Sequence, residues 1–181
     1  MTRRPAWFAC IALSALTPTR AHADDLARAT SYETPPRKGF YGEMSVRPGG
    51  FAVRDGLVPA MRTHLTLGGG ITDRFKLGMQ LSVAGYMNGV KKPAVGFDTV
   101  ATGYVWRGLY LRAGFGLVSR VPITAEGDQS RPGYGGLAGL GHEWTLHKGT
   151  SLGLGVDLDM RVTTDRHIAR GFLVGLHFAF H

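Results

Sequence analysis

The chain ends in the stretch Arg170-Gly171-Phe172-Leu173-Val174-Gly175-Leu176-His177-Phe178-Ala179-Phe180-His181. Every second residue is large and apolar, in the series Phe172, Val174, Leu176, Phe178 and Phe180. The residues between them are mostly small or polar. A repeat of two residues indicates a β-strand, because successive side chains of a strand point to opposite faces. The stretch therefore predicts a final strand with one wholly apolar face that ends in aromatic residues.

The same alternation recurs upstream, between turn signals such as Thr72-Asp73 and Arg107-Gly108. It predicts seven earlier strands, over residues 39–47, 60–71, 74–87, 95–106, 109–120, 133–146 and 151–162. Most of these segments are long enough for tilted transmembrane strands of about nine to eleven residues. Strands of soluble proteins are typically about five or six residues long.

Long and short connections alternate along this series of segments. Pro48-Gly49-Gly50 is expected to end the first strand and to open a loop that reaches Pro59. Long loops at one end of a barrel and tight turns at the other are typical of outer-membrane proteins. The sequence therefore predicts an all-β fold, an eight-stranded antiparallel up-and-down transmembrane β-barrel. An even number of strands puts both chain ends on the short-turn side, which is periplasmic in such barrels.

One segment, 95–106, breaks the alternation. Val105 falls on the face opposite Asp98, as a membrane-facing residue should, but Trp106 shares the face of Asp98. A β-bulge or an aromatic position at the membrane interface accounts for such a change of face.

The N-terminus reads as a secretory signal peptide over residues 1–23. Arg3 and Arg4 precede a short apolar run, and Ala21-His22-Ala23 matches an A-x-A cleavage site. Residues 24–38 are polar and carry no periodicity, so we expect a flexible periplasmic leader before a barrel domain over residues 39–181. The alternative of an uncleaved anchor is disfavoured, because the apolar run is too short to cross a membrane as a helix.

Removal of the signal peptide would change the chemistry open to the chain. Cys10 is the one cysteine of the sequence and would leave with the signal, so a disulfide or a thiolate metal site is not expected. The net charge is +8, and loss of Arg3, Arg4 and Arg20 would lower it to +5. These charges form no basic stripe with interleaved aromatic residues, which argues against nucleic-acid binding.

A soluble barrel also alternates, with its apolar face inward. The composition of the polar face distinguishes a soluble barrel from a transmembrane one. This face is rich in glycine: Gly114, Gly116, Gly139, Gly141, Gly153, Gly155, Gly171 and Gly175. Glycine weakens a strand exposed to water, but it makes room inside a narrow eight-stranded barrel. The polar face is therefore predicted to line the lumen and the apolar face to meet lipid.

Charges of both signs lie on the polar face and are expected to form an inward salt-bridge network, because buried charges are tolerated when they are paired. The predicted network is Glu43, Arg47, Arg62, Lys76, Asp98, Arg112, Glu143, Asp157, Asp159 and Arg161.

With its signal peptide, eight alternating segments and closing strand, the sequence resembles the OmpA/OmpX-type eight-stranded outer-membrane β-barrels of Gram-negative bacteria. The resemblance covers residues 39–181 and implies that Phe172, Phe178 and Phe180 belong to a signal read by the barrel-assembly machinery. Such chains usually end in an aromatic residue, whereas here Phe180 is followed by His181. A peptidoglycan-binding domain, which the longer relatives carry after the barrel, is not expected here.

Enzymes occur among small outer-membrane barrels, and a lipid hydrolase would need a serine, a histidine and an acidic residue together. Ser82 and His142 are of the right type, but their parity puts Ser82 inside and His142 outside. Asp165 and His167 share the last loop, where a solvated loop is the preferred interpretation over a catalytic pair.

A metal site has little support in the sequence. His64 and His177 both face inward but lie on strands distant in sequence, so we expect hydrogen-bonded lumen histidines rather than metal ligands. No cofactor is expected. Loop cations that could meet lipopolysaccharide phosphates are Arg54, Lys91, Lys92, Arg131, Arg166 and Arg170.

These observations together predict a monomeric, non-enzymatic outer-membrane protein with a side-chain-filled lumen and a structural or surface-interaction role. Its expected partners are outer-membrane lipid and lipopolysaccharide, with no nucleic acid. Two alternatives remain open at this point. One is a narrow porin-like channel for ions or small solutes, and the other is a lipid A or phospholipid hydrolase or acyltransferase.

Overall fold

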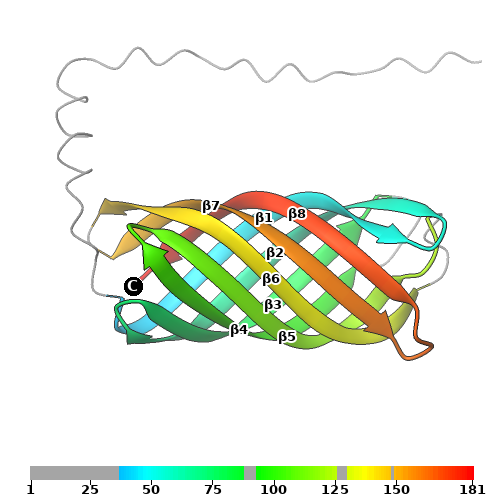
Figure 1. Ribbon diagram of the computed structural model, residues 1–181, viewed down its shortest axis with the longest axis horizontal. Helices are drawn as coiled ribbons and strands as arrows, with labels where there is room; N and C mark the ends of the chain where they lie inside the picture. The colour runs from blue at the N-terminus through cyan, green and yellow to red at the C-terminus, as the bar shows by residue number, and fades with distance from the viewer. Residues whose placement is uncertain (1–36, 88–92, 126–129, 148) are drawn as a thin grey trace, which may run out of the picture. The chain divides into compact units, whose positions relative to one another are not determined.

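A computed structural model of the chain describes residues 37–87, 93–125, 130–147 and 149–181. These residues form one closed barrel in which each strand pairs antiparallel with the next and β8 returns to β1 (Figure 1). The strands are β1 (Gly39–Val53), β2 (Gly56–Thr72), β3 (Phe75–Tyr86), β4 (Ala94–Trp106), β5 (Leu109–Pro122), β6 (Ser130–His147), β7 (Thr150–Thr163) and β8 (Ile168–Phe180). The predicted eight-stranded up-and-down barrel is confirmed. Within the described residues, no helix is long and apolar enough to cross a membrane.

The two ends of the barrel differ in their connections. The terminal end is where β1 begins and β8 ends, and it carries the two-residue β2–β3 and β4–β5 turns. The distal end carries the two-residue β1–β2 turn and the longer β3–β4, β5–β6 and β7–β8 connections. Both ends of the barrel sequence therefore lie on the side opposite the longer connections, as the even strand count predicts.

The predicted end of the first strand is wrong. Pro48-Gly49-Gly50 does not break β1, which continues to Val53 and turns at Arg54 and Asp55 directly into β2. The ladder to β8 runs from Gly42 to Val46, passes over Arg47 and Pro48, and resumes at Gly49. Proline lacks an N–H group, so it interrupts a ladder on one side. The pairing with β2 continues through this point and holds the strand together.

The apolar face of each strand points outward and the charged face inward. In β8, Phe172 and Leu176 are 53% and 56% exposed, whereas the inward Leu173 is fully buried. In β6, Leu140 is 55% exposed on the outer wall. A soluble barrel has the reverse arrangement, with apolar residues inside. The predicted orientation of the two faces is therefore the one observed.

A β-bulge resolves the ambiguity at the end of β4. Tyr104 pairs with Tyr110, but the next pair joins Trp106 to Leu109, so the register shifts by one residue. Tyr104 therefore stays inside at 7% exposure, whereas Val105 and Trp106 both face outward. The bulge places the Trp106 indole on the outer surface at the terminal end of the barrel.

Apolar side chains fill the distal end of the lumen. We call this group the distal cap, and it consists of Phe51, Val58, Ala60, Ala84, Tyr86, Ala94, Val118, Val121 and Ala169. Phe51 and Tyr86 form its aromatic centre, with ring centroids 5.9 Å apart. The sequence pattern does not predict the cap, because Pro48-Gly49-Gly50 favours a loop over residues 48–59.

Inward glycines leave room in the lumen for the large side chains of neighbouring strands. One pair of glycine-to-alanine substitutions tests this role. A Cβ atom on Gly175 would collide with the Val46 carbonyl oxygen and the Arg47 Cα of β1. On the outward Gly103 it would meet nothing within 4 Å. We expect Gly175→Ala to lower the free energy of unfolding by about 1–3 kcal/mol. Gly103→Ala should leave it unchanged or raise it by up to about 1 kcal/mol.

The measurement is urea unfolding of the refolded barrel in micelles, followed by tryptophan fluorescence. Equal effects of Gly175→Ala and Gly103→Ala would contradict the packing argument.

Candidate functional site

The inner wall brings together all ten charged residues that were expected to line the lumen. Each is at most 9% exposed, and Arg47 and Asp98 are fully buried. They come from β1, β2, β3, β4, β5, β6 and β7. Because alternate residues of each strand face inward, strands far apart in sequence point their charges at one another across a narrow lumen. The charges divide into three clusters along the barrel.

The terminal cluster is centred on the Glu143 carboxylate of β6. The Tyr104 hydroxyl donates a hydrogen bond of 2.6 Å to its Oε2 atom. Other partners surround it: His181 at 3.5 Å, Arg37 and His177 at 3.7 Å, and Lys76 at 3.8 Å. The Lys76 ammonium also donates to the Tyr104 hydroxyl at 2.6 Å. One carboxylate thus holds groups from three strands, together with one residue before β1 and one after β8.

Two residues of the terminal cluster were not expected there. Arg37 belongs to the segment interpreted as a flexible leader, yet it is 2% exposed and its guanidinium lies 3.4 Å from the centre of the Tyr104 ring. The His181 side chain also points into the barrel, with Nε2 at 3.4 Å from the Ser151 hydroxyl. Its backbone N–H donates to the Gly149 carbonyl at 2.7 Å. The chain therefore ends inside this mouth of the barrel (Figure 1).

The central cluster lies next along the lumen, around Glu43 of β1. The Arg112 guanidinium donates to Glu43 at 2.9 Å and also to the Gln80 side-chain oxygen. Arg47 lies 3.9 Å from Glu43 and 2.6 Å from the Asp157 carboxylate. The Arg112–Glu43 contact is a charge-assisted hydrogen bond, which is stronger than one between neutral groups, whereas the Arg47 contacts are ion pairs. Two buried guanidinium groups and two buried carboxylates therefore compensate one another at the middle of the barrel.

The distal cluster is built on Arg161 of β7. Its guanidinium makes a two-pronged contact with Asp98, at 2.7 and 3.1 Å, and also bonds Asp159 through Nε at 2.6 Å. Arg62 completes the cluster through Asp159. The Arg62 guanidinium also lies 5.1 Å from the centre of the Phe51 ring, so this cluster adjoins the distal cap.

Not every buried lumen group has a partner. We expected His64 and His177 to be hydrogen-bonded. His177 contacts the Tyr110 hydroxyl at 3.4 Å. For His64 the prediction is wrong: it is 1% exposed, and neither of its ring nitrogens has a hydrogen-bond partner among the described residues.

The residues considered for catalysis are not brought together. Ser82 is buried inside the barrel, whereas the His142 ring packs on Trp144 with centroids 4.8 Å apart. Asp165 forms an ion pair with Arg131 at 3.4 Å rather than serving as an orienting partner for His167. Among the described residues, no group of three histidine, cysteine or acidic side chains is placed to hold a metal ion.

The three aromatic residues proposed as an assembly signal all lie on the outer surface of β8. Phe172, Phe178 and Phe180 are 53%, 43% and 40% exposed. The Phe180 ring packs over Gly42 and lies 6.2 Å from the ring of Phe40 on the neighbouring β1.

Comparison with known proteins supports the fold. No protein-family model matches the chain, and no curated protein sequence matches it either. The Neisserial surface protein A (NspA) structure superposes with a TM-score of 0.60 at 14% identity, over 79% of this chain and 97% of that one. The N-terminal barrel of Pseudomonas aeruginosa OprF (TM-score 0.44, 15% identity) covers 76% of this chain and 97% of its own. The P. aeruginosa outer membrane protein OprG (TM-score 0.38, 9% identity) covers 82% of this chain and 99% of its own.

The likeness to NspA is one of fold. Together with the closed eight-stranded topology, it confirms that the chain has the OmpA/OmpX-type barrel fold.

Proposed function

We propose that this chain is a non-enzymatic outer-membrane β-barrel whose lumen is closed by its own side chains, with a structural or surface-interaction role. The observation that carries the proposal is the pairing of an apolar exterior with a lumen full of compensated charge. Water outside such a barrel would leave a wide band of leucine, methionine and phenylalanine exposed. Lipid outside it would bury that band.

Side chains at three positions along the barrel support closure of the lumen. The terminal cluster occupies one mouth with Arg37 and His181, the central and distal clusters occupy the middle, and the distal cap occupies the other end. An eight-stranded barrel is only wide enough for side chains to fill. A solute would have to displace several ion pairs and an aromatic pair to pass.

We further propose that the chain is exported and that both ends of the barrel face the periplasm. The signal peptide over residues 1–23 supports export, although these residues lie outside those the structure describes. The three longer connections at the distal end support the orientation, because the long loops of such barrels are extracellular and the short turns periplasmic.

The proposed partners are lipid, lipopolysaccharide and the barrel-assembly machinery, the last reading the β8 aromatics. Arg166 and Arg170 are exposed at the distal end, where lipid phosphates would meet them. Lys91 and Lys92, which were expected to join them, lie outside the described residues. We propose that the protein acts as a monomer.

Planar-bilayer recording tests the closed lumen. We expect the purified protein to insert without producing single-channel steps, because the lumen holds three charge clusters and the distal cap in series. A porin inserted in the same bilayer serves as the positive control, and a heat-modifiability gel checks that the inserted protein is folded. Stable, reproducible conductance steps from the native chain would overturn closure in favour of a narrow channel.

An enzymatic role is tested separately. We expect the mass spectra of lipid A and phospholipids to be the same in cells with and without the protein. An acyl group gained or lost only in its presence would overturn the non-enzymatic proposal.

A further inference from the structure

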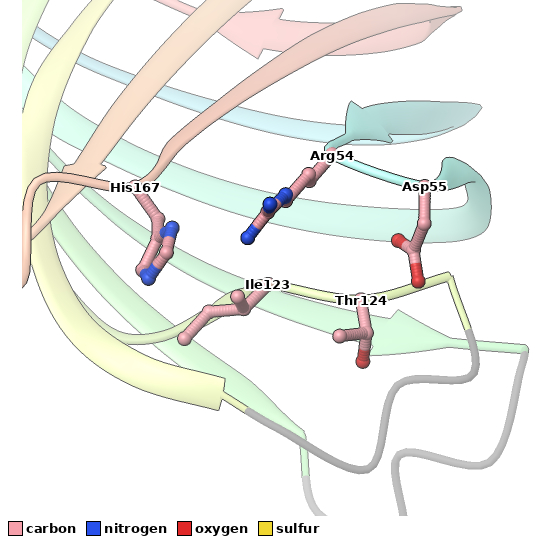
Figure 2. Close-up of a pocket in the computed structure, with 5 residues that line it drawn as sticks. All are labelled: Arg54, Asp55, Ile123, Thr124 and His167. Carbon is pink, nitrogen blue, oxygen red and sulfur yellow. The ribbon is translucent and has the colours of Figure 1, made fainter.

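The distal end carries a cavity that the closed-lumen function does not use. It has a volume of about 490 Å³ and is lined by Arg54, Asp55, Ile123, Thr124 and His167 (Figure 2). We call it the distal cup. The lining comes from three separate connections: the β1–β2 turn, the start of the β5–β6 loop and the β7–β8 loop. A cavity of this size is in the range of small-molecule sites.

Several contacts fix the walls of the cup. The Asp55 carboxylate accepts a hydrogen bond of 2.8 Å from the Ala125 N–H, which ties the β1–β2 turn to the β5–β6 loop. On the other side, the Thr163 hydroxyl accepts a hydrogen bond of 3.0 Å from the His167 N–H, and the Thr163 N–H donates to the His167 carbonyl at 2.9 Å. The backbone that presents the lining side chains is therefore held before any ligand arrives.

Two of the polar side chains in the cup are unengaged. Within the described part of the chain, neither the Arg54 guanidinium nor the His167 imidazole makes a hydrogen bond or an ion pair. Both extend into the space above Ile123 in Figure 2. Asp165 pairs with Arg131 at 3.4 Å, and one Asp55 oxygen accepts from Ala125. Within the described residues, no ion pair joins either acid to Arg54. A guanidinium without a partner presents five N–H donors, in the geometry that a carboxylate accepts.

The rest of the lining suits a sugar. Ile123 is 8% exposed and forms an apolar floor. The Asp55 carboxylate and the Thr124 hydroxyl are polar groups on the side of the cup away from His167 (Figure 2). A sugar acid has matching parts: one carboxylate, an apolar ring face and several hydroxyl groups that donate to carboxylates.

We propose that the distal cup binds an acidic sugar, with Arg54 holding the sugar carboxylate, His167 beside it and Ile123 under the ring. The ligand is either a free sugar acid or an acidic residue of a surface polysaccharide, which share this chemistry. The inference deepens the proposed surface-interaction role. Its placement on the cell exterior rests on the proposed orientation, whereas binding by the purified barrel does not.

The test uses the full mature chain, refolded in detergent micelles and titrated with glucuronate. We expect saturable shifts of the Thr124 and His167 backbone amide signals in two-dimensional NMR spectra, with a dissociation constant on the order of 1 mM, since a small exposed site binds weakly. Glucose, which lacks the carboxylate, should bind at least about tenfold more weakly, because it leaves Arg54 unpaired. A glucuronate-containing trisaccharide distinguishes the sources, since tighter binding of it indicates a polysaccharide residue.

Arg54→Ala is expected to weaken glucuronate binding at least about tenfold. The matched control is Arg170→Ala, which removes an exposed distal arginine outside the cup lining and should leave binding unchanged. A heat-modifiability gel confirms that both variants fold. Failure of both glucuronate and the trisaccharide to bind would overturn the proposal, as would equal loss in the two variants. Channel recordings test the closed lumen and not sugar binding, so failure of the closed-lumen proposal can be distinguished from failure of the acidic-sugar proposal.

Discussion

Replacing Glu143 with alanine is expected to lower the free energy of unfolding by about 3–5 kcal/mol, because removing one partner leaves buried charges uncompensated. Glu143 is the one carboxylate within 4 Å of the Lys76 ammonium and the Arg37 guanidinium among the described residues. It also accepts the 2.6 Å hydrogen bond of Tyr104. Without it, two buried cations face each other at the terminal mouth with no countercharge. The measurement is urea unfolding of the refolded barrel, monitored by tryptophan fluorescence.

An exposed ion pair provides the control. Asp165 and Arg131 lie 3.4 Å apart, with side chains 53% and 62% exposed. Asp165→Ala should therefore cost only about 0–1 kcal/mol. The double variant Glu143→Gln with Lys76→Met should recover part of the loss, because it removes a cation together with the anion. Equal effects of Glu143→Ala and Asp165→Ala would contradict the central position of Glu143 in the terminal cluster.

Placing an arginine at Leu140 is expected to destabilise the folded barrel in a lipid bilayer by about 2–4 kcal/mol, the cost of a cation at the bilayer midplane. Leu140 lies on the outer wall near the middle of β6 and is 55% exposed. Water around the barrel would make the same change harmless, since an exposed arginine is well solvated. The size of the effect therefore distinguishes a lipid-facing wall from a water-facing one.

The measurement is urea-dependent folding into phospholipid vesicles. Ile168→Arg is the matched control, because Ile168 is the first residue of β8 at the distal end and is 49% exposed. There the cost should fall to about 0–1 kcal/mol, as it does near the membrane interface. A Leu140→Arg barrel as stable as the native one would refute the proposed membrane location.

The closing strand shows how much of this fold the local sequence pattern encodes. Phe172 to Phe180 alternate with small and polar residues, and the structure places these phenylalanines outside and Leu173 and His177 inside. This inference needed only the two-residue repeat of a strand. The number of strands, their antiparallel order and the direction of the apolar face followed in the same way. Prediction failed at Pro48-Gly49-Gly50, because pairing with β2 overrides the local tendency of these residues to break a strand.

The sequence alone determined the barrel, its apolar exterior and the set of charges that line the lumen. Only the tertiary structure decided which charge meets which. Arg112 and Glu43 are 69 residues apart in sequence, and Arg62 and Asp159 are 97 apart. The stagger of the closed barrel sets these partners, and no local pattern encodes it. The same closure draws Arg37 and His181 into the terminal mouth, and it assembles the distal cup from three loops that are separate in sequence.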